Sequence, residues 1–241
     1  MKKLVVIICL FAFFAIQSCT ERGSEEKAPH TEELIFESFD GIKVSRLFNV
    51  KVIKGDKYKV TASVPERYAD GLSIEIDSEN NLVVSMTYDV KNTKRRDVFE
   101  AEITCPSFNR IIAEDLCKIN VISEFSAENM ELRAISLSEI SFKEQLMVEN
   151  NCKINAENMS KIVVSGTVSS LEIDADNMAN VDCSMMSAKN VKASARSMSN
   201  ITVSADEKFE LEASNMSGIK YSGNGEVIRT VSESMSTIKK R

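Results

Sequence analysis

A seven-residue pattern that recurs about every 20 residues in the second half of the chain limits the fold more than any other feature. Each copy has a small residue, a polar residue two positions later, then Met or Leu, another small residue, and Ile or Val two positions after that; residues 156–162 and 175–181 are examples. The Met or Leu positions are Leu116, Leu137, Met159, Met178, Met198, Met216 and Met235, which lie 21, 22, 19, 20, 18 and 19 residues apart.

The residues that flank each copy alternate between apolar and polar, which is the period of a β-strand. Leu171, Ile173 and Ala175 alternate with polar residues before one Asn-Met pair, and Val181 and Cys183 do so after it. A repeat of about 20 residues built from such strands is typical of a β-solenoid. We therefore predict an all-β chain that forms a right-handed, single-stranded β-helix of about seven repeats, because parallel crossovers are right-handed.

Stacking of the repeats predicts which side chains lie above one another. One expected column of apolar side chains consists of Met130, Cys152, Leu171, Val191 and Phe209. A second column, of small residues before the bend, consists of Ala113, Ala134, Ala156, Ala175, Ala195 and Ala213. Small residues suit a tightly curved backbone that leaves little room inside.

The Asn-Met-Ser bend is the candidate site within the repeats, and two interpretations are open. In the structural one, Asn158, Asn177 and Asn215 take left-handed backbone geometry, which Asn tolerates, and their amides form a hydrogen-bonded ladder. In the functional one, stacked thioethers about 4.8 Å apart hold Cu(I); the sulfurs belong to Met159, Met178, Met198, Met216 and Met235. Because Leu116 and Leu137 share this column, the sequence favours apolar packing, and we expect no metal and no cofactor.

The N-terminus has the features of an export signal. Lys2 and Lys3 precede an apolar run over residues 4–16, which is too short to span a bilayer because a span needs about 20 residues. The run leads to Ile16-Gln17-Ser18-Cys19, which resembles a bacterial lipobox. An ordinary secretory signal with an incidental cysteine is the alternative.

These features give three expectations for the first 33 residues. Residues 1–18 are a signal peptide, Cys19 carries the lipid, and residues 19–33 include a polar, flexible tether. The protein is then exported and lipid-anchored to the outer membrane, on its periplasmic or cell-surface side.

Residues 34–107 read as an N-terminal strand-rich region that caps the repeats or leads into them. Short alternating runs are separated by turn residues at Gly55, Pro65 and Asn80, and such runs indicate antiparallel strands. We expect residues 34–107 to be continuous with the β-helix repeats of residues 108–241.

The composition excludes several functional classes. A single His excludes a His pair or a three-His metal site. A net charge of −6 leaves no electrostatic footprint for nucleic acid. The body contains no CxxC motif, so we expect buried free thiols, with pairing left open; the cysteines are Cys105, Cys117, Cys152 and Cys183.

One acidic stretch could support an enzymatic alternative. Asp174, Asp176 and Asp182 lie close together in sequence within one predicted coil, and β-helices that cleave polysaccharides use such carboxylates. The chain has no Trp and only 6% aromatic residues, which leaves little surface for stacking against sugars. Acidic residues on outward strand positions also serve solubility, and the sequence favours that role.

Four segments together resemble the head GIN domain family, over roughly residues 36–230. They are residues 39–44 (FDGIKV), 48–55 (FNVKVIKG), 81–84 (NLVV) and 103–111 (ITCPSFNRI). The resemblance implies a lipoprotein or secreted protein of Bacteroidetes with β-helical repeats, and it supplies no catalytic residues.

The expected function is therefore a non-enzymatic cell-envelope lipoprotein that presents a β-helical surface for binding, in adhesion among other roles. Its expected partners are the membrane, through the lipid anchor, and an envelope protein or glycan. Two alternatives remain: a polysaccharide-active enzyme and a purely structural envelope component.

Overall fold

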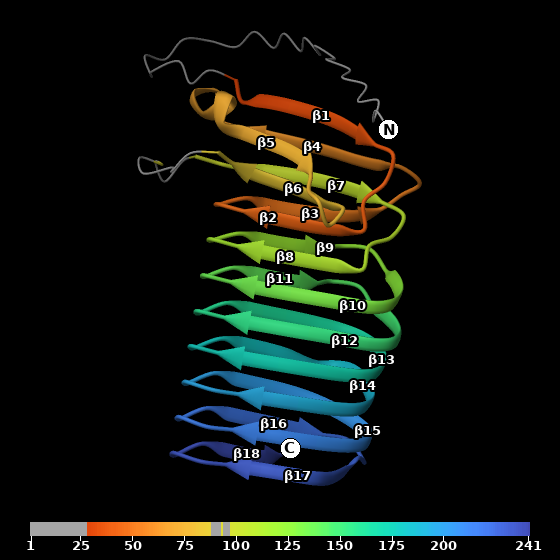
Figure 1. The fold of residues 1–241 in the computed structure, drawn as a ribbon, viewed down its shortest axis with the longest axis vertical. Helices are drawn as coiled ribbons and strands as arrows, with labels where there is room; N and C mark the ends of the chain where they lie inside the picture. The colour runs from red at the N-terminus through yellow and green to blue at the C-terminus, as the bar shows by residue number, and fades with distance from the viewer. Residues whose placement is uncertain (1–27, 88–92, 94–96) are drawn as a thin grey trace, which may run out of the picture.

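The chain winds into a β-solenoid of about seven turns below a mixed N-terminal sheet (Figure 1). The computed structural model describes residues 28–87, 93 and 97–241. Within these residues, 18 strands join one continuous sheet. In Figure 1 the chain descends with its nearer strands running to the left and its farther strands to the right, which is a right-handed winding. The predicted fold class is confirmed.

The repeat region consists of parallel strands that stack in register, because consecutive coils add the same residue positions to the same wall. Its strands are β8 (Arg110–Glu114), β9 (Lys118–Val121), β10 (Phe125–Ile135), β11 (Glu139–Phe142), β12 (Leu146–Glu157), β13 (Lys161–Asp176), β14 (Asn180–Ala195), β15 (Asn200–Ala213), β16 (Gly218–Ser222), β17 (Glu226–Ser232) and β18 (Thr237–Lys240).

Two walls make up each coil, which we call a rung. The front wall contains β8, β17 and the C-terminal parts of β10 and β12 to β15, and it faces the viewer in Figure 1. The back wall contains β9, β11, β16, β18 and the N-terminal parts of β13 to β15. Both predicted columns are present: Met130 pairs with Cys152 and Ala134 with Ala156, and each column continues down the stack in the expected order.

The N-terminal region adds seven strands and one short 3-10 helix above the repeats. They are β1 (His30–Phe36), β2 (Gly41–Ser45), β3 (Asn49–Lys54), β4 (Tyr58–Val64), η1 (Glu66–Gly71), β5 (Leu72–Ile76), β6 (Asn81–Met86) and β7 (Glu100–Cys105). Strand β1 begins at His30, inside the segment that the sequence suggested as a tether. It pairs antiparallel with β4 along its whole length.

The expectation of antiparallel pairing throughout residues 34–107 is wrong in part. Strands β1, β4, β5 and β6 form antiparallel pairs, and β4 also runs antiparallel to β7. Strands β2 and β3, however, pair in parallel with β8 and β9 below and with β6 and β7 above. Strands β2 and β3 together form a full rung of the solenoid. This rung comes first in the sequence, but in space β6 and β7, which come later in the sequence, lie above it.

The core is a narrow column of side chains between the two walls. Inward positions such as Ile154, Leu171 and Val203 are buried, while their neighbours on either side point outward. Burying one Leu, Ile or Val side chain stabilises the folded state by about 1.5–3 kcal/mol. A solenoid of this kind is stable because each rung covers the apolar face of the next.

Candidate functional site

Every repeat turns at the same edge of the solenoid through two consecutive residues with positive φ. Asn177 has a φ of 54° and Met178 one of 63°, and the same pairing recurs from Asp115 and Leu116 down to Ser234. Left-handed geometry costs about 1–2 kcal/mol for a residue with a side chain, though less for Asn. The turn therefore depends on the contacts that it makes with neighbouring rungs.

Backbone hydrogen bonds between successive turns supply those contacts. The N–H of Met159 donates to the carbonyl of Asn177 at 2.8 Å, and that of Met178 to the carbonyl of Ser197 at 2.9 Å. Met198 continues this chain of bonds. These bonds hold successive turns one strand spacing apart, about 4.8 Å.

The asparagine amides contribute less to the stack than the backbone does. Asn158, Asn177 and Asn215 have φ values of 56°, 54° and 56°. The amide Nδ2 of Asn177 donates to Oδ1 of Asn158 at 3.2 Å. Ser197 stands between Asn177 and Asn215 in the stack and has a φ of 52°.

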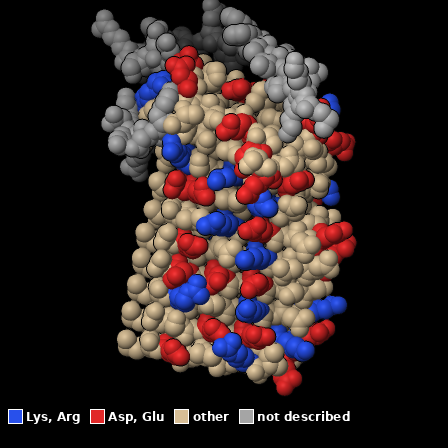
Figure 2. Space-filling model, viewed as in Figure 1, with Lys and Arg blue, Asp and Glu red and all other residues tan. Residues whose placement is uncertain are grey.

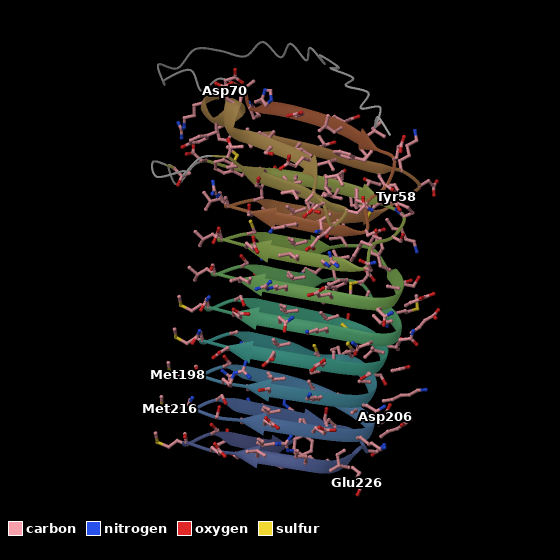
Figure 3. The ribbon with its side chains drawn as sticks, viewed as in Figure 1. Tyr58, Asp70, Met198, Asp206, Met216 and Glu226 are labelled. Carbon is pink, nitrogen blue, oxygen red and sulfur yellow. The ribbon has the colours of Figure 1, made fainter. Side chains whose placement is uncertain are left out.

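The residues after these polar ones form a solvent-exposed apolar row, which we call the methionine ridge. Its side chains are 47 to 83% exposed. Figure 3 shows Met198 and Met216 pointing outward from this edge. The members of the methionine ridge are Leu116, Leu137, Met159, Met178, Met198, Met216 and Met235.

The structure places this column at the surface and outside the core. Two left-handed residues in succession direct the Met or Leu away from the interior, and the next residue turns inward instead. Ser160, Ala179, Ser199 and Ser217 are buried. The hydroxyl of Ser199 accepts from the N–H of Ala179 at 3.1 Å. The small residue after each methionine was the available signal, because only a small side chain fits inside such a bend.

The front wall carries a column of outward side chains whose charges alternate from rung to rung (Figure 2). Each member lies opposite the next in the strand register, and Glu131 contacts Arg110 at 3.3 Å. The column consists of Arg110, Glu131, Lys153, Glu172, Lys192, Glu210 and Arg229. We call it the charge ladder. Because positive and negative members alternate, their charges offset one another along this column.

The three carboxylates proposed for catalysis do not meet at one place. Asp174 and Asp176 lie on the front wall, where Arg196 approaches them at 2.9 and 3.6 Å. Asp182 lies on the back wall beyond the turn, opposite Val163 in the register. Its Oδ1 accepts from the N–H of Ser184 at 3.0 Å. The turn between them separates residues that are close in sequence.

The four cysteines of the body are buried and free, as the sequence indicated. Burial raises the pKa of Cys105, Cys117 and Cys152 to about 12. Burial also raises the pKa of Cys183 well above its usual value. At neutral pH these thiols are protonated and act as small apolar side chains.

A hollow of about 670 Å³ lies near the top of the repeats, where the loop before β8 faces the start of β10. Asn109, Glu128 and Asn129 contribute polar side chains from the upper rungs, and Asn151 and Lys153 do so from the rung below. The strand register shifts between Ala127 and Asn129, as it does in the next pair below. Such irregularities re-aim side chains and often lie beside functional sites.

The sequence did not reveal this hollow, because its lining comes from separate rungs and depends on bulges rather than on the repeat. The guanidinium of Arg110 is fixed at its border. It donates to Asn81 Oδ1 and Glu79 Oε2, both at 3.1 Å. The floor contains the buried rings of Phe39 and Phe108.

Two expected features of the N-terminus lie outside the described residues, namely the signal peptide at 1–18 and the lipid site at Cys19. In the part of the chain that the structure describes, no helix has the length and hydropathy to cross a membrane. Over the same residues, no group of three or more His, Cys, Asp or Glu side chains gathers as a metal site. Methionine sulfur is not one of the ligands in such a group, so this finding says nothing about metal binding by methionines.

Comparison with protein families gives one match. The family model described as "Putative auto-transporter adhesin, head GIN domain" matches residues 38–225. No curated protein matches the chain significantly.

Several solved structures share the fold. A "putative adhesin" from Bacteroides fragilis is 17% identical, with a TM-score of 0.79 over 89% of this chain and 98% of that one. A "putative lipid binding protein" from Parabacteroides distasonis is 14% identical, with a TM-score of 0.66 over 89% and 97%. A "putative adhesin" from Parabacteroides merdae is 12% identical, with a TM-score of 0.64 over 89% and 97%. At these identities the likeness shows the fold alone.

Proposed function

The chain belongs to the head GIN domain family, and from that premise we propose that it is a non-enzymatic cell-envelope lipoprotein that binds an envelope protein or glycan, in adhesion. The observation that carries the proposal is the family match over residues 38–225. The solenoid supports it, because stacked rungs offer an extended surface for binding.

The hollow is where we place the binding of that partner. Its polar lining of Asn109, Asn129 and Asn151 offers amide donors and acceptors that suit hydroxyl or peptide groups. The side chains of Glu128 and Lys153 add one charge of each sign. A concave site with a few convergent polar groups is the usual form of a binding site.

The arrangement of the acidic residues disfavours the enzymatic alternative. Arg196 ion-pairs with Asp174 and approaches Asp176, so both carboxylates on the front wall are already engaged by a cation of the protein itself. Asp182 faces the other side of the rung. If the protein cleaves envelope polysaccharides and an Asp174→Ala variant does not, the enzymatic alternative is correct.

Binding to intact cells and to envelope extracts tests the proposal. The full chain should bind in a saturable manner, and a variant with Asn129→Ala and Asn151→Ala should bind at least about tenfold more weakly, which is about 1.4 kcal/mol. Asn190→Ala is the matched control, because Asn190 lies in the same column as Asn151, two rungs below it and outside the hollow. If Asn190→Ala weakens binding as much as the double variant does, the hollow is not the binding site. If the chain binds no partner in a saturable manner, the adhesive function is wrong. Copurification of the chain with other envelope components in a fixed ratio would favour a structural role.

The lipid anchor and the localisation need their own measurements. We propose acylation at Cys19 and attachment to the outer membrane, on the evidence of the lipobox-like residues 16–19. Mass spectrometry of the mature N-terminus should show a diacyl or triacyl cysteine, and Cys19→Ser should release the protein from membranes. Protease treatment of whole cells then distinguishes the cell-surface side from the periplasmic side.

A further inference from the structure

The methionine ridge presents thioethers at positions where neither backbone geometry nor burial favours them. Left-handed geometry favours Gly or Asn, and a side chain that is half exposed is usually polar. Methionine meets neither preference, yet it occupies five successive rungs from Met159 to Met235. Backbone geometry and burial therefore do not explain why methionine occupies these positions, and its sulfur atom is the feature left to explain it.

The backbone places these sulfurs at a regular interval. Each N–H from Met159 to Met216 donates to a carbonyl of the next turn at 2.8 to 2.9 Å, so neighbouring methionines lie one strand spacing apart, about 4.8 Å. Two metal–sulfur bonds of about 2.3 Å, the length found for zinc and sulfur, span about 4.6 Å. The side chain of Met is unbranched and has three rotatable bonds, which lets two sulfurs turn toward one ion.

The surroundings of the ridge favour a soft cation over a hard one. The residue before each methionine is neutral, as at Asn177 and Ser197, and the residue after it is Ser or Ala. Figure 2 shows this edge of the repeats in tan, without Lys, Arg, Asp or Glu at its tip. Hard cations such as Mg²⁺ and Ca²⁺ take oxygen ligands from carboxylates, whereas soft thioether ligands select Cu(I).

We propose that the five methionines of the ridge bind Cu(I) between neighbouring rungs, and Ag(I) as its soft analogue. The sequence had favoured apolar packing for this column because Leu116 and Leu137 belong to it. Exposure of the whole column removes that argument. The two leucines mark the upper end of the ridge, where we expect no metal. This inference is independent of the proposed adhesive function, because it concerns a different edge of the molecule.

Competition with a colorimetric Cu(I) chelator in the absence of oxygen tests the proposal on the full chain. The ridge variant carries Met159→Leu, Met178→Leu, Met198→Leu and Met216→Leu. Leucine occupies the same turn at Leu116 and Leu137, so the variant keeps the apolar surface and the backbone geometry while losing sulfur. We expect wild type to bind more than one ion per chain and the variant to bind at least about tenfold more weakly. Equal binding by the two proteins would overturn the proposal.

Two controls exclude other sulfur atoms. All proteins carry Cys9→Ser and Cys19→Ser, because those thiols lie outside the described residues, and the remaining cysteines are buried. Met185→Leu is the matched methionine control, because Met185 is 77% exposed and does not belong to the ridge. This variant should bind Cu(I) as wild type does. A loss equal to that of the ridge variant would contradict the assignment.

A measurement on the wild-type sequence covers the case in which the ridge variant fails to fold. With methyl-labelled methionine, Ag(I) should shift the NMR signals of the ridge methyl groups before those of Met147 and Met185, which are exposed elsewhere. Zn²⁺ at the same concentration should leave all of these signals in place. Equal shifts at ridge and non-ridge methionines would mean adventitious binding and would overturn the proposal.

Discussion

At the scale of single residues, the left-handed pair at each turn decides which side chains the fold accepts. Met178 has a φ of 63° and is about half exposed, so its side chain gives little packing energy to offset backbone strain. Residues branched at Cβ are the least suited to this geometry. The backbone therefore limits the ridge residue only by disfavouring branching at Cβ. It does not distinguish a side chain that contains sulfur, as in Met, from one that does not, as in Leu.

This limit predicts different outcomes for two substitutions of similar volume. Met178→Ile should lower the free energy of unfolding by about 1–2 kcal/mol, because branching at Cβ makes the left-handed geometry more costly. Met178→Leu should leave it within about 0.5 kcal/mol of wild type, the usual effect of a surface change. Urea unfolding followed by circular dichroism provides both values. Equal destabilisation by the two variants would contradict the account.

At the scale of elements, Gly166 shapes the bend of its own rung, on the side of the solenoid away from the ridge. Gly166 lies within β13, where it has a φ of 139° and pairs with Leu146. A Cβ at this position would lie 1.9 Å from the carbonyl oxygen of Leu146. Because that oxygen belongs to the backbone of the adjacent rung, the clash cannot be relieved by a side-chain rotation.

Gly166→Ala should therefore destabilise the protein by about 2–4 kcal/mol, in the range of strained backbone substitutions. Gly218→Ala is the matched control, because a Cβ there would meet only the side-chain ends of Asn200 at 3.0 Å and Thr237 at 3.7 Å. Thermal unfolding of the two variants beside wild type gives the comparison. A Gly166→Ala protein as stable as the control would show that the bend can shift to accommodate a side chain.

Adjacent elements of the back wall also share one ion-pair cluster. Glu139 of β11 lies between Lys118 of β9 at 3.2 Å and Lys161 of β13 at 3.4 Å. Partial burial alone would raise the pKa of Glu139. The hydrogen bonds and positive charges of the two lysines outweigh that effect and hold the pKa below its usual value of 4.5.

A depressed pKa in the folded state means that ionised Glu139 stabilises the protein above the pKa of the unfolded chain. That stabilisation is lost as the pH falls through the lower pKa of the folded state. Glu139→Gln should therefore be less stable than wild type at about pH 7, with a difference that shrinks toward about pH 3. Urea unfolding across this range measures the difference. A difference that stays constant with pH would exclude the ionisation of Glu139 as its cause.

At the scale of the whole molecule, the repeat made the solenoid predictable and left its ends and its exposed edge unpredicted. The column from Met130 to Phe209 followed from spacing alone, because parallel stacking places equivalent positions above one another. The rung formed by β2 and β3 did not follow, since residues 34–107 lack the repeat and only tertiary pairing orders them. The exposure of the ridge was not predicted, because the repeat spacing does not show whether the residue at a bend faces the core or the solvent.

The hollow and the separated carboxylates had no sequence signal for related reasons. Asn129 and Asn151 meet through bulged positions, and the repeat pattern does not register bulges. Asp176 and Asp182 are close in sequence but lie on opposite walls, because a two-residue turn reverses the chain between them. Sequence distance is thus a poor guide to spatial distance in this fold, where neighbours in space are about 20 residues apart.

The charge ladder links the rungs of the whole solenoid and permits a test of long-range register. Each inner member faces an opposite charge in the rung above and in the rung below, so a shift by one rung would bring like charges together. Glu172→Lys places a positive charge directly between Lys153 and Lys192, and like charges in direct register are destabilising. We expect Glu172→Lys to lower the free energy of unfolding by about 1–2 kcal/mol at low salt. Glu172→Gln, which removes attraction without adding repulsion, should lower it by less than about 0.5 kcal/mol.

Raising the ionic strength to about 1 M should shrink the difference between the two variants, because it shortens the screening length to about 3 Å. Urea unfolding at both salt concentrations measures this difference, and a penalty for Glu172→Lys that does not respond to salt would mean that packing, and not charge, sets the preference at this position.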